Sequence, residues 1–255
     1  MSVPESITLP VSETFVSIQG EGLLAGTPSW FVRLSGCNLR CAWCDTPYAS
    51  WRPDTAGTGG GLRTIADLVA EARAARWQGA PVSHVVLTGG EPMMFDGLEP
   101  LAAALAPHMH ITIETAGTIF RPVPRGLMSI SPKLASSAPT AEQALALGGP
   151  GAGHWPARHE AGRINLAALQ ALLDAHPAPG RQLKFVYCGQ GDLAEIDALL
   201  APLRGITPAD ILLMPEGITP PSTETKAAVL SVCASRGWRY CPRLHIEMFG
   251  NVRGT

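Results

Sequence analysis

Alternating apolar and polar positions predict strands in the first part of the chain. Residues 7–11 alternate in this way and residues 15–18 form a second short apolar run, so two strands are expected before residue 19. Another strand is predicted at 30–35. Because successive side chains of a strand point to opposite faces, Phe31 and Arg33 should share one face of it.

From about residue 64 the pattern becomes a repeat of helices and strands. Thr64 stands three residues before Asp67 at the start of an amphipathic run, which resembles a capping box and predicts that a helix begins there. Further strands are predicted at 84–88, 111–115, 127–131, 183–187 and 211–214. Further helices are predicted at about 98–106, 166–175, 193–203 and 222–235. Residues 51–63, with three consecutive glycines, predict a flexible loop.

This alternation indicates parallel strands joined by crossover helices. Six strands, beginning at residues 30, 84, 111, 127, 183 and 211, predict an α/β fold of the partial (β/α)6 barrel type. The length of 255 residues fits a single domain over 1–255. Glycine-rich residues 135–162 predict an irregular insertion that extends the connection after the fourth strand.

Composition narrows the class of protein. The formal charge is −2 and the basic residues are scattered, which disfavours a direct nucleic-acid partner. No apolar run approaches the ~20 residues that cross a bilayer, so we expect no membrane span. Residues 1–5 lack a basic start and an apolar stretch, which argues against secretion and favours a reducing cytoplasm for the six cysteines.

Three cysteines directly after the strand at 30–35 are the candidate metal ligands. Their spacing, Cys37-x3-Cys41-x2-Cys44, suggests that three thiolates converge on one point. A structural zinc site needs a fourth ligand, but Asp45 is a hard ligand and the next histidine is the distant His84. Three cysteines around a four-iron cluster would instead leave one iron open to a small molecule.

The same motif resembles the cluster motif of the radical S-adenosylmethionine (SAM) superfamily. Its surroundings, SIQGEG at 17–22 and FVRLSGCNLRCAWCDT at 31–46, resemble the 7-carboxy-7-deazaguanine synthase family within it. The resemblance implies a partial barrel of the radical SAM type, with a [4Fe–4S] cluster on the three cysteines. It also implies that SAM binds the open iron and that Thr46 binds Mg²⁺.

Candidate SAM-binding residues follow the predicted strands, because active sites in parallel barrels collect at the C-terminal strand ends. The segment after residue 88 contains Gly90 and Glu91 and looks like the superfamily segment that binds the SAM amino group. By the same resemblance, two further strand ends are assigned to SAM: Ser131, Pro132 and Lys133, and Met214, Pro215, Glu216 and Gly217.

Candidate substrate-binding residues begin with Arg33, whose guanidinium can pair with a carboxylate through two hydrogen bonds. Glu114 suits a ribose hydroxyl or the amino edge of a pterin, with a solvated strand end as the alternative. The other candidates offer backbone, amide, hydroxyl or imidazole groups: Ile18, Gln19, Gly20, Thr88 and His245, the last by resemblance alone. The remaining histidines show no ligand spacing: His84, His108, His110, His154, His159 and His176.

The resemblance implies radical ring contraction of 6-carboxy-5,6,7,8-tetrahydropterin to 7-carboxy-7-deazaguanine with loss of ammonia, in queuosine or deazapurine biosynthesis. It also implies a homodimer and an electron donor such as flavodoxin or ferredoxin. Two alternatives stay open. A radical SAM activase that makes a glycyl radical on a protein shares the cysteines and the Gly-Gly-Glu segment, and a non-catalytic module would hold zinc or a closed cluster.

Overall fold

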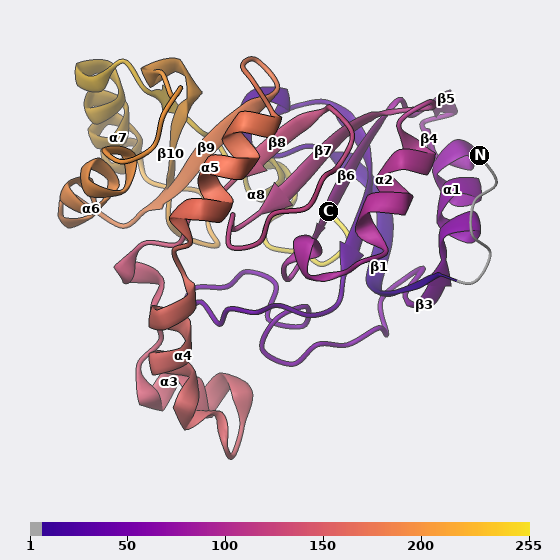
Figure 1. Cartoon of the computed structure of the whole chain (residues 1–255), viewed down its shortest axis with the longest axis horizontal. Coiled ribbons are helices and arrows are strands. Elements are labelled where there is room, and N and C mark those ends of the chain that lie inside the picture. Colours follow the sequence, from indigo (N-terminus) through magenta and orange to yellow (C-terminus); the bar gives the residue numbers. More distant parts are fainter. Residues whose placement is uncertain (1–6) are drawn as a thin grey trace.

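The computed structural model describes residues 7–255, which are built around one nine-stranded sheet (Figure 1). In spatial order its strands are β11 (Arg239–Tyr240), β10 (Ile211–Pro215), β9 (Arg181–Tyr187), β8 (Leu127–Ile130), β7 (His110–Thr115), β6 (His84–Gly89), β2 (Pro28–Leu34), β1 (Thr8–Ile18) and β3 (Gly61–Thr64). Neighbours from β2 to β11 are parallel, whereas β1 and β3 are antiparallel to their neighbours. The six predicted strands are confirmed, and they lie side by side in sequence order, as a partial barrel requires.

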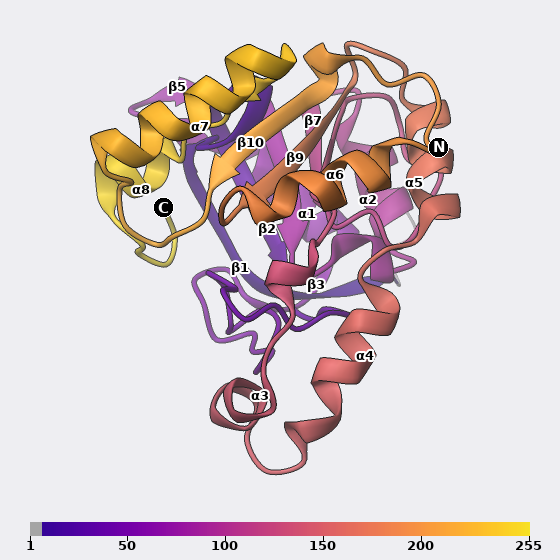
Figure 2. The same cartoon turned by 90° about the vertical axis from the view of Figure 1, so that its left-hand side faces the viewer.

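Five helices cover one face of this sheet (Figures 1 and 2). They are α1 (Ile65–Ala74), α2 (Leu98–Leu105), α5 (Leu166–Ala175), α6 (Gly191–Leu200) and α7 (Thr223–Arg236). Their apolar residues and alternate strand residues form one buried core, to which α2 contributes Leu98, Leu101 and Leu105. Thr64 caps α1 by accepting a hydrogen bond from the Asp67 N–H, as expected.

The alternation of β2 separates the core from a cavity on the other face. Trp30, Val32 and Leu34 are buried in the core, while Phe31 and Arg33 line the cavity. The same division recurs in β9, where Phe185 joins the core. Each central strand therefore stabilises the fold with one set of side chains and presents the other set to the cavity.

The sequence predicted an irregular insertion at 135–162, but these residues are largely helical. They contain α3 (Ala141–Gly148) and α4 (Trp155–Gly162), which project together from the body (Figures 1 and 2). A capping box between Thr140 and Gln143 begins α3. The glycines at 148–153 end α3 and form the turn between the two helices. The irregular structure that they favour is therefore confined to this turn.

The other differences between the predicted and the observed elements involve short segments. The two strands expected before residue 19 are one strand, β1, whose register shifts between Val11 and Glu13. The last residues of the expected loop 51–63 form β3. The sequence pattern did not predict the β4 (Arg76–Trp77) and β5 (Ala80–Pro81) pair, β11 or α8 (Leu244–Phe249). Single turns of 3-10 helix occupy Gly22–Leu24, Pro92–Met94, Ala135–Ser137, Ala152–His154 and Pro208–Asp210. Among residues 7–255 there is no helix long and apolar enough to span a bilayer.

Candidate active site

A cavity of about 500 Å³ opens at the C-terminal ends of the parallel strands. It gathers predicted site residues from segments up to 227 positions apart: Ile18, Gln19, Gly20, Arg33, Cys37, Cys41, Cys44, Thr46, Thr88, Gly90, Glu114, Ser131, Lys133, Met214, Glu216, Gly217 and His245. Glu91, Pro132 and Pro215 do not line it. Residues proposed for the cluster, SAM and the substrate thus share one cavity.

The three cysteines lie on the loop that follows β2 and all line this cavity. The spacing predicted that the three thiolates converge on one point. Residues 7–255, however, contain no group of three His, Cys, Asp or Glu side chains placed to hold a single ion. Each cysteine of a four-iron cluster binds a different iron, so separated thiols fit a cluster better than zinc. Burial raises the pKa of Cys37 to about 12 and also raises the pKa of Cys44, so thiolates here need a nearby cation.

Glu91 lies behind the cavity wall rather than in it. Its buried carboxylate accepts hydrogen bonds from the backbone N–H groups of Met93 and Ala116 and from the Thr115 hydroxyl. The backbone beside it packs on the cysteine loop, where a Cβ at Gly90 would collide with the carbonyl oxygen of Gly36. Glu91 therefore holds the shape of this segment, and the segment presents backbone to the cavity.

Arg33 is held by a buried ion pair. Its Nε donates to Oε1 of Glu13 at 2.7 Å, and Tyr48 donates to the same oxygen at 2.9 Å. Burial alone would lower the pKa of Arg33, but Tyr48 and Glu13 raise it above its usual value. Among residues 7–255 no hydrogen bond engages its Nη groups, which leaves these two donors for a ligand in the cavity.

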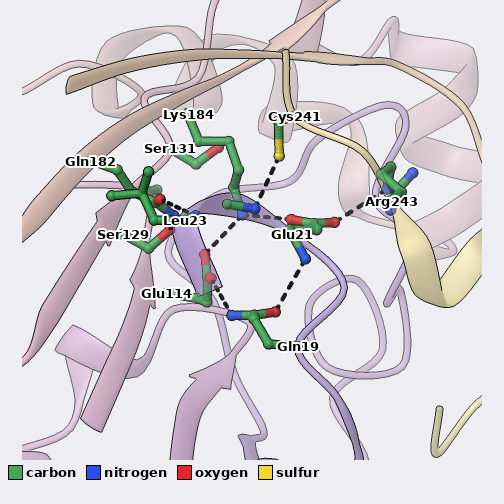
Figure 3. A network of polar contacts seen from close by, with 12 residues as sticks. Gln19, Glu21, Leu23, Glu114, Ser129, Ser131, Gln182, Lys184, Cys241 and Arg243 are labelled. Atoms are coloured by element: carbon green, nitrogen blue, oxygen red, sulfur yellow. Dashed lines mark hydrogen bonds and ion pairs between the residues drawn. The ribbon is translucent and has the colours of Figure 1, made fainter. Parts of the chain in front are cut away.

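Lys184 is a buried cation that the sequence reasoning missed. From β9 its Nζ contacts Oε2 of Glu21 at 2.5 Å and Oε2 of Glu114 at 3.0 Å, and Glu114 also accepts from Nε2 of Gln19 at 3.1 Å (Figure 3). Two carboxylates from distant segments therefore share one ammonium group. A lysine inside the otherwise apolar run 183–187 was the signal available in the sequence.

Arg243 extends this network toward the cysteine loop. It pairs with Glu21 at 3.2 Å (Figure 3). It also pairs with Asp45, the residue next to the last cysteine of the motif. Burial would raise the pKa of Glu21, but Lys184 and Arg243 outweigh it and hold that pKa well below the usual carboxyl range. Glu21 is thus ionised across the physiological range.

His245, at the start of α8, lies against Gly20. A Cβ at Gly20 would collide with Nδ1 of His245, so the glycine gives the ring its space. Burial lowers the pKa of His245 below its usual value, although Glu21 acts in the opposite direction. The imidazole is therefore neutral at pH 7 and can either donate or accept a hydrogen bond.

Two further candidates lie beside the cysteines. The Thr46 hydroxyl is 3.8 Å from Sγ of Cys44 and faces the same cavity. Lys133 donates to the Ser131 hydroxyl at 2.8 Å, with its Nζ 5.8 Å from the centre of the Trp43 ring. Both side chains present polar groups near the thiols.

The last part of the chain also lines the cavity, through Asn251, Val252, Arg253 and Thr255. Arg253 fixes this segment: it bonds to Glu13 at 3.0 Å and to Asp54 at 2.9 Å, and its guanidinium lies 4.0 Å from the centre of the Tyr48 ring. Glu13 thus contacts both Arg33 and Arg253. No local pattern around Arg253 reveals this contact.

Comparison with known proteins agrees with this geometry. Residues 31–130 match the model of the Radical SAM superfamily. A 7-carboxy-7-deazaguanine synthase of Halobacterium salinarum is 44% identical over 97% of this chain and 93% of its own length, and one of Rhodopirellula baltica is 41% identical over 97% and 89%. The chain belongs to the 7-carboxy-7-deazaguanine synthase family.

A solved structure supports the same family membership. The crystal structure of QueE from Escherichia coli aligns with a TM-score of 0.68 and 27% identity, covering 94% of this chain and 96% of the other. The alignments to members of the 7-carboxy-7-deazaguanine synthase family therefore run through the strands, the cysteine loop and the residues at the C-terminal side of the cavity. Membership of the Radical SAM superfamily implies a [4Fe–4S] cluster and SAM as cofactors.

Proposed function

We propose that this protein contracts the ring of 6-carboxy-5,6,7,8-tetrahydropterin to form 7-carboxy-7-deazaguanine with loss of ammonia. The observation that carries the proposal is the shared cavity. It combines three cysteine thiols on one wall with Arg33, Glu114 and His245 on another. A compact anionic substrate and a cofactor can therefore meet in one cavity at the strand ends.

Arg33 would bind the substrate carboxylate. Glu13 orients the guanidinium through Nε, so the Nη donors can form the paired hydrogen bonds that a carboxylate accepts. The neutral ring of His245 and the hydroxyl of Thr88 would add contacts to the same substrate. A fixed carboxylate orients the reacting carbon, which is the main contribution a protein makes to cofactor-borne chemistry.

Glu114 and Gln19 would bind the pterin's amino edge. Lys184 keeps the Glu114 carboxylate in place. That carboxylate can accept hydrogen bonds from N–H groups of the kind found on an aminopyrimidine. The backbone of Ile18 and Gly20 lies along the same wall. This wall would discriminate by hydrogen bonds, which reject analogues that lack the matching groups.

Cys37, Cys41 and Cys44 would hold the [4Fe–4S] cluster, and Thr46 would bind Mg²⁺. When bound, the cluster supplies an electron to SAM, and SAM supplies the group that takes a hydrogen atom from the substrate. Gly90, Ser131, Lys133, Met214, Glu216 and Gly217 are the proposed SAM contacts that line the cavity. Glu91, Pro132 and Pro215 would act by shaping those segments.

The proposed setting is cytoplasmic queuosine or deazapurine biosynthesis, without direct contact to nucleic acid or membrane. The proposed partners are a second copy of the chain and a one-electron donor such as flavodoxin or ferredoxin. A diffusible donor fits a site where the cysteine loop and the projecting helices lie at one end of the molecule (Figure 2).

An anaerobic assay tests this function. Reconstituted protein is incubated with SAM, a chemical reductant, Mg²⁺ and the pterin, and products are identified by mass spectrometry. We expect 7-carboxy-7-deazaguanine without any protein partner, which also separates this activity from that of a glycyl-radical activase. Formation of 5′-deoxyadenosine without the deazaguanine would contradict the proposed substrate, and a protein that assembles a four-iron cluster but yields neither product would contradict the proposed chemistry.

A further inference from the structure

His159 connects the projecting helices to the cysteine loop. It lies on α4, is fully buried, and accepts a hydrogen bond through Nδ1 from the backbone N–H of Arg40 at 3.1 Å. Since Nδ1 is the acceptor, the proton of the neutral ring is on Nε2, which contacts the Ser137 hydroxyl at 2.9 Å. Ser137 in turn donates to the carbonyl of Leu134 at 2.6 Å.

Ser137 completes a second bond to the loop. Its carbonyl accepts the backbone N–H of Ala42 at 2.9 Å. The N–H groups of Arg40 and Ala42, on either side of Cys41, are therefore both bound by residues of 135–162. Both acceptors are buried, so water does not readily replace them.

Other contacts lie around this connection. The guanidinium of Arg40 lies 4.1 Å from the centre of the Trp155 ring, and Nε1 of Trp51 donates to the Cys41 carbonyl at 2.9 Å. Arg52 donates to the carbonyl of Leu147 at 2.7 Å, at the end of α3. The projecting helices thus also contact the cysteine loop at Arg40 and the segment after it at Arg52.

We propose that His159 is a positioning residue that holds the Arg40–Ala42 backbone and thereby fixes the direction of the Cys41 thiol. This role rests on the proposed function only in so far as Cys41 binds a cluster. The bonds themselves belong to the protein without its cofactors. The sequence spacing of His159 is not that of a metal ligand. Its proposed role is to orient the cluster ligand Cys41 and not to bind the cluster itself.

The test compares His159→Leu with His159→Asn and His154→Ala. Leucine fills much of the space but makes neither bond, whereas asparagine keeps an acceptor near the position of Nδ1. His154 is an exposed histidine of the same insertion that contacts the carbonyl of Gly151, so His154→Ala is the matched control. Ser137→Ala is the second variant if His159→Leu does not fold.

The first measurement is amide exchange of a peptide covering residues 38–43 in the protein without cluster. We expect about tenfold faster exchange in His159→Leu, partial rescue in His159→Asn and no change in His154→Ala. The second is the rate at which the reconstituted cluster loses its absorbance after exposure to air, which should follow the same order. The EPR signal of the reduced cluster should broaden in His159→Leu alone.

Two results would overturn the proposal. One is exchange and cluster loss in folded His159→Leu at the wild-type rates. The other is equal damage in the leucine and asparagine variants, because then the ring's volume and not its hydrogen bond would matter. Neither result depends on the identity of the substrate, so failure of ring contraction in the wild-type protein remains a separate outcome.

Discussion

Glu13 binds Arg33 through Nε of the guanidinium, and Glu13, unlike Arg33, does not line the cavity. The bond joins Oε1 to Nε at 2.7 Å, and the exposed fractions of the two side chains are only 3% and 14%. Among residues 7–255 no hydrogen bond engages the Nη groups of Arg33, so these donors can serve a ligand in the cavity that Arg33 lines. Arg33 is thus the residue whose removal should most affect substrate binding.

We expect Arg33→Ala to lower kcat/KM for ring contraction by about 100-fold or more, because loss of a charge-assisted pair in a buried site typically costs ~3 kcal/mol. Steady-state assays would measure this loss. Iron and sulfide content after reconstitution should equal that of the wild type. A variant that cannot assemble the cluster would contradict the assignment of Arg33 to the substrate.

Arg253→Ala should release residues 251–255 from Glu13 and Asp54 and open one wall of the cavity. We expect KM for the pterin to rise roughly tenfold, since small misplacements of a site cost rate through lost orientation. The matched control is Arg236→Ala, which removes a comparably exposed pair with Asp197 on α6 and α7. Equal KM values for both variants would show that Arg253 does not shape the site.

Lys184→Met should destabilise the fold by about 3 kcal/mol, because it leaves Glu21 and Glu114 close together in a buried site without their shared cation. Thermal unfolding followed by circular dichroism would report a lower Tm. The double variant Lys184→Met/Glu21→Gln should recover part of the loss, since one unpaired carboxylate is removed. A double variant less stable than Lys184→Met would argue against this account of the network.

The stability provided by Glu21 should depend on pH in a defined direction. Its pKa is depressed in the folded protein, so its contribution is fully present above the ordinary carboxyl pKa near 4.5 and is lost as the pH falls below that value. The difference in free energy of unfolding between wild type and Glu21→Gln should therefore be constant from pH 6 to 8 and shrink toward pH 3. Urea titrations at several pH values would measure it, and a difference that grows on acidification would reverse the assigned sign.

Gly20→Ala should impair catalysis because the new Cβ would displace the His245 ring. We expect a drop in kcat/KM of about tenfold or more, with little change in Tm. Gly191→Ala is the control, since a Cβ at Gly191, at the start of α6, meets no atom within 4 Å. Its activity should match that of the wild type. Activity retained in Gly20→Ala would show that His245 does not need its present position.

The sequence predicted the strands at 30–35 and 84–88 and most of the residues that line the cavity. The alternation of apolar residues along a strand, and the polar residues that directly follow it, are both visible within a short stretch of sequence. The capping pair of Thr64 and Asp67 likewise marked a helix start. Residues 135–162 are largely helical, although their glycines predict an irregular segment, because Thr140 and Gln143 form a capping box that begins α3.

Contacts between distant segments could not be predicted in this way. Lys184 and Glu21 are 163 positions apart, and their pairing depends on the order of strands in the sheet. The position of the Glu91 side chain could not be predicted either. The motif identified the segment, but only the hydrogen bonds from Thr115 and Ala116 show that its carboxylate is buried in the protein and does not face the cavity.

The buried chain of alternating charges from Glu114 through Lys184 and Glu21 to Arg243 has a consequence for work in concentrated salt. Dissolved ions screen charges that are exposed to solvent, and they act far less on pairs enclosed by protein. The wall proposed to bind the pterin should therefore keep its pattern of charge from dilute buffer to molar salt. Any strong dependence of turnover on ionic strength would then report the encounter with the proposed electron donor at the surface rather than recognition inside the cavity.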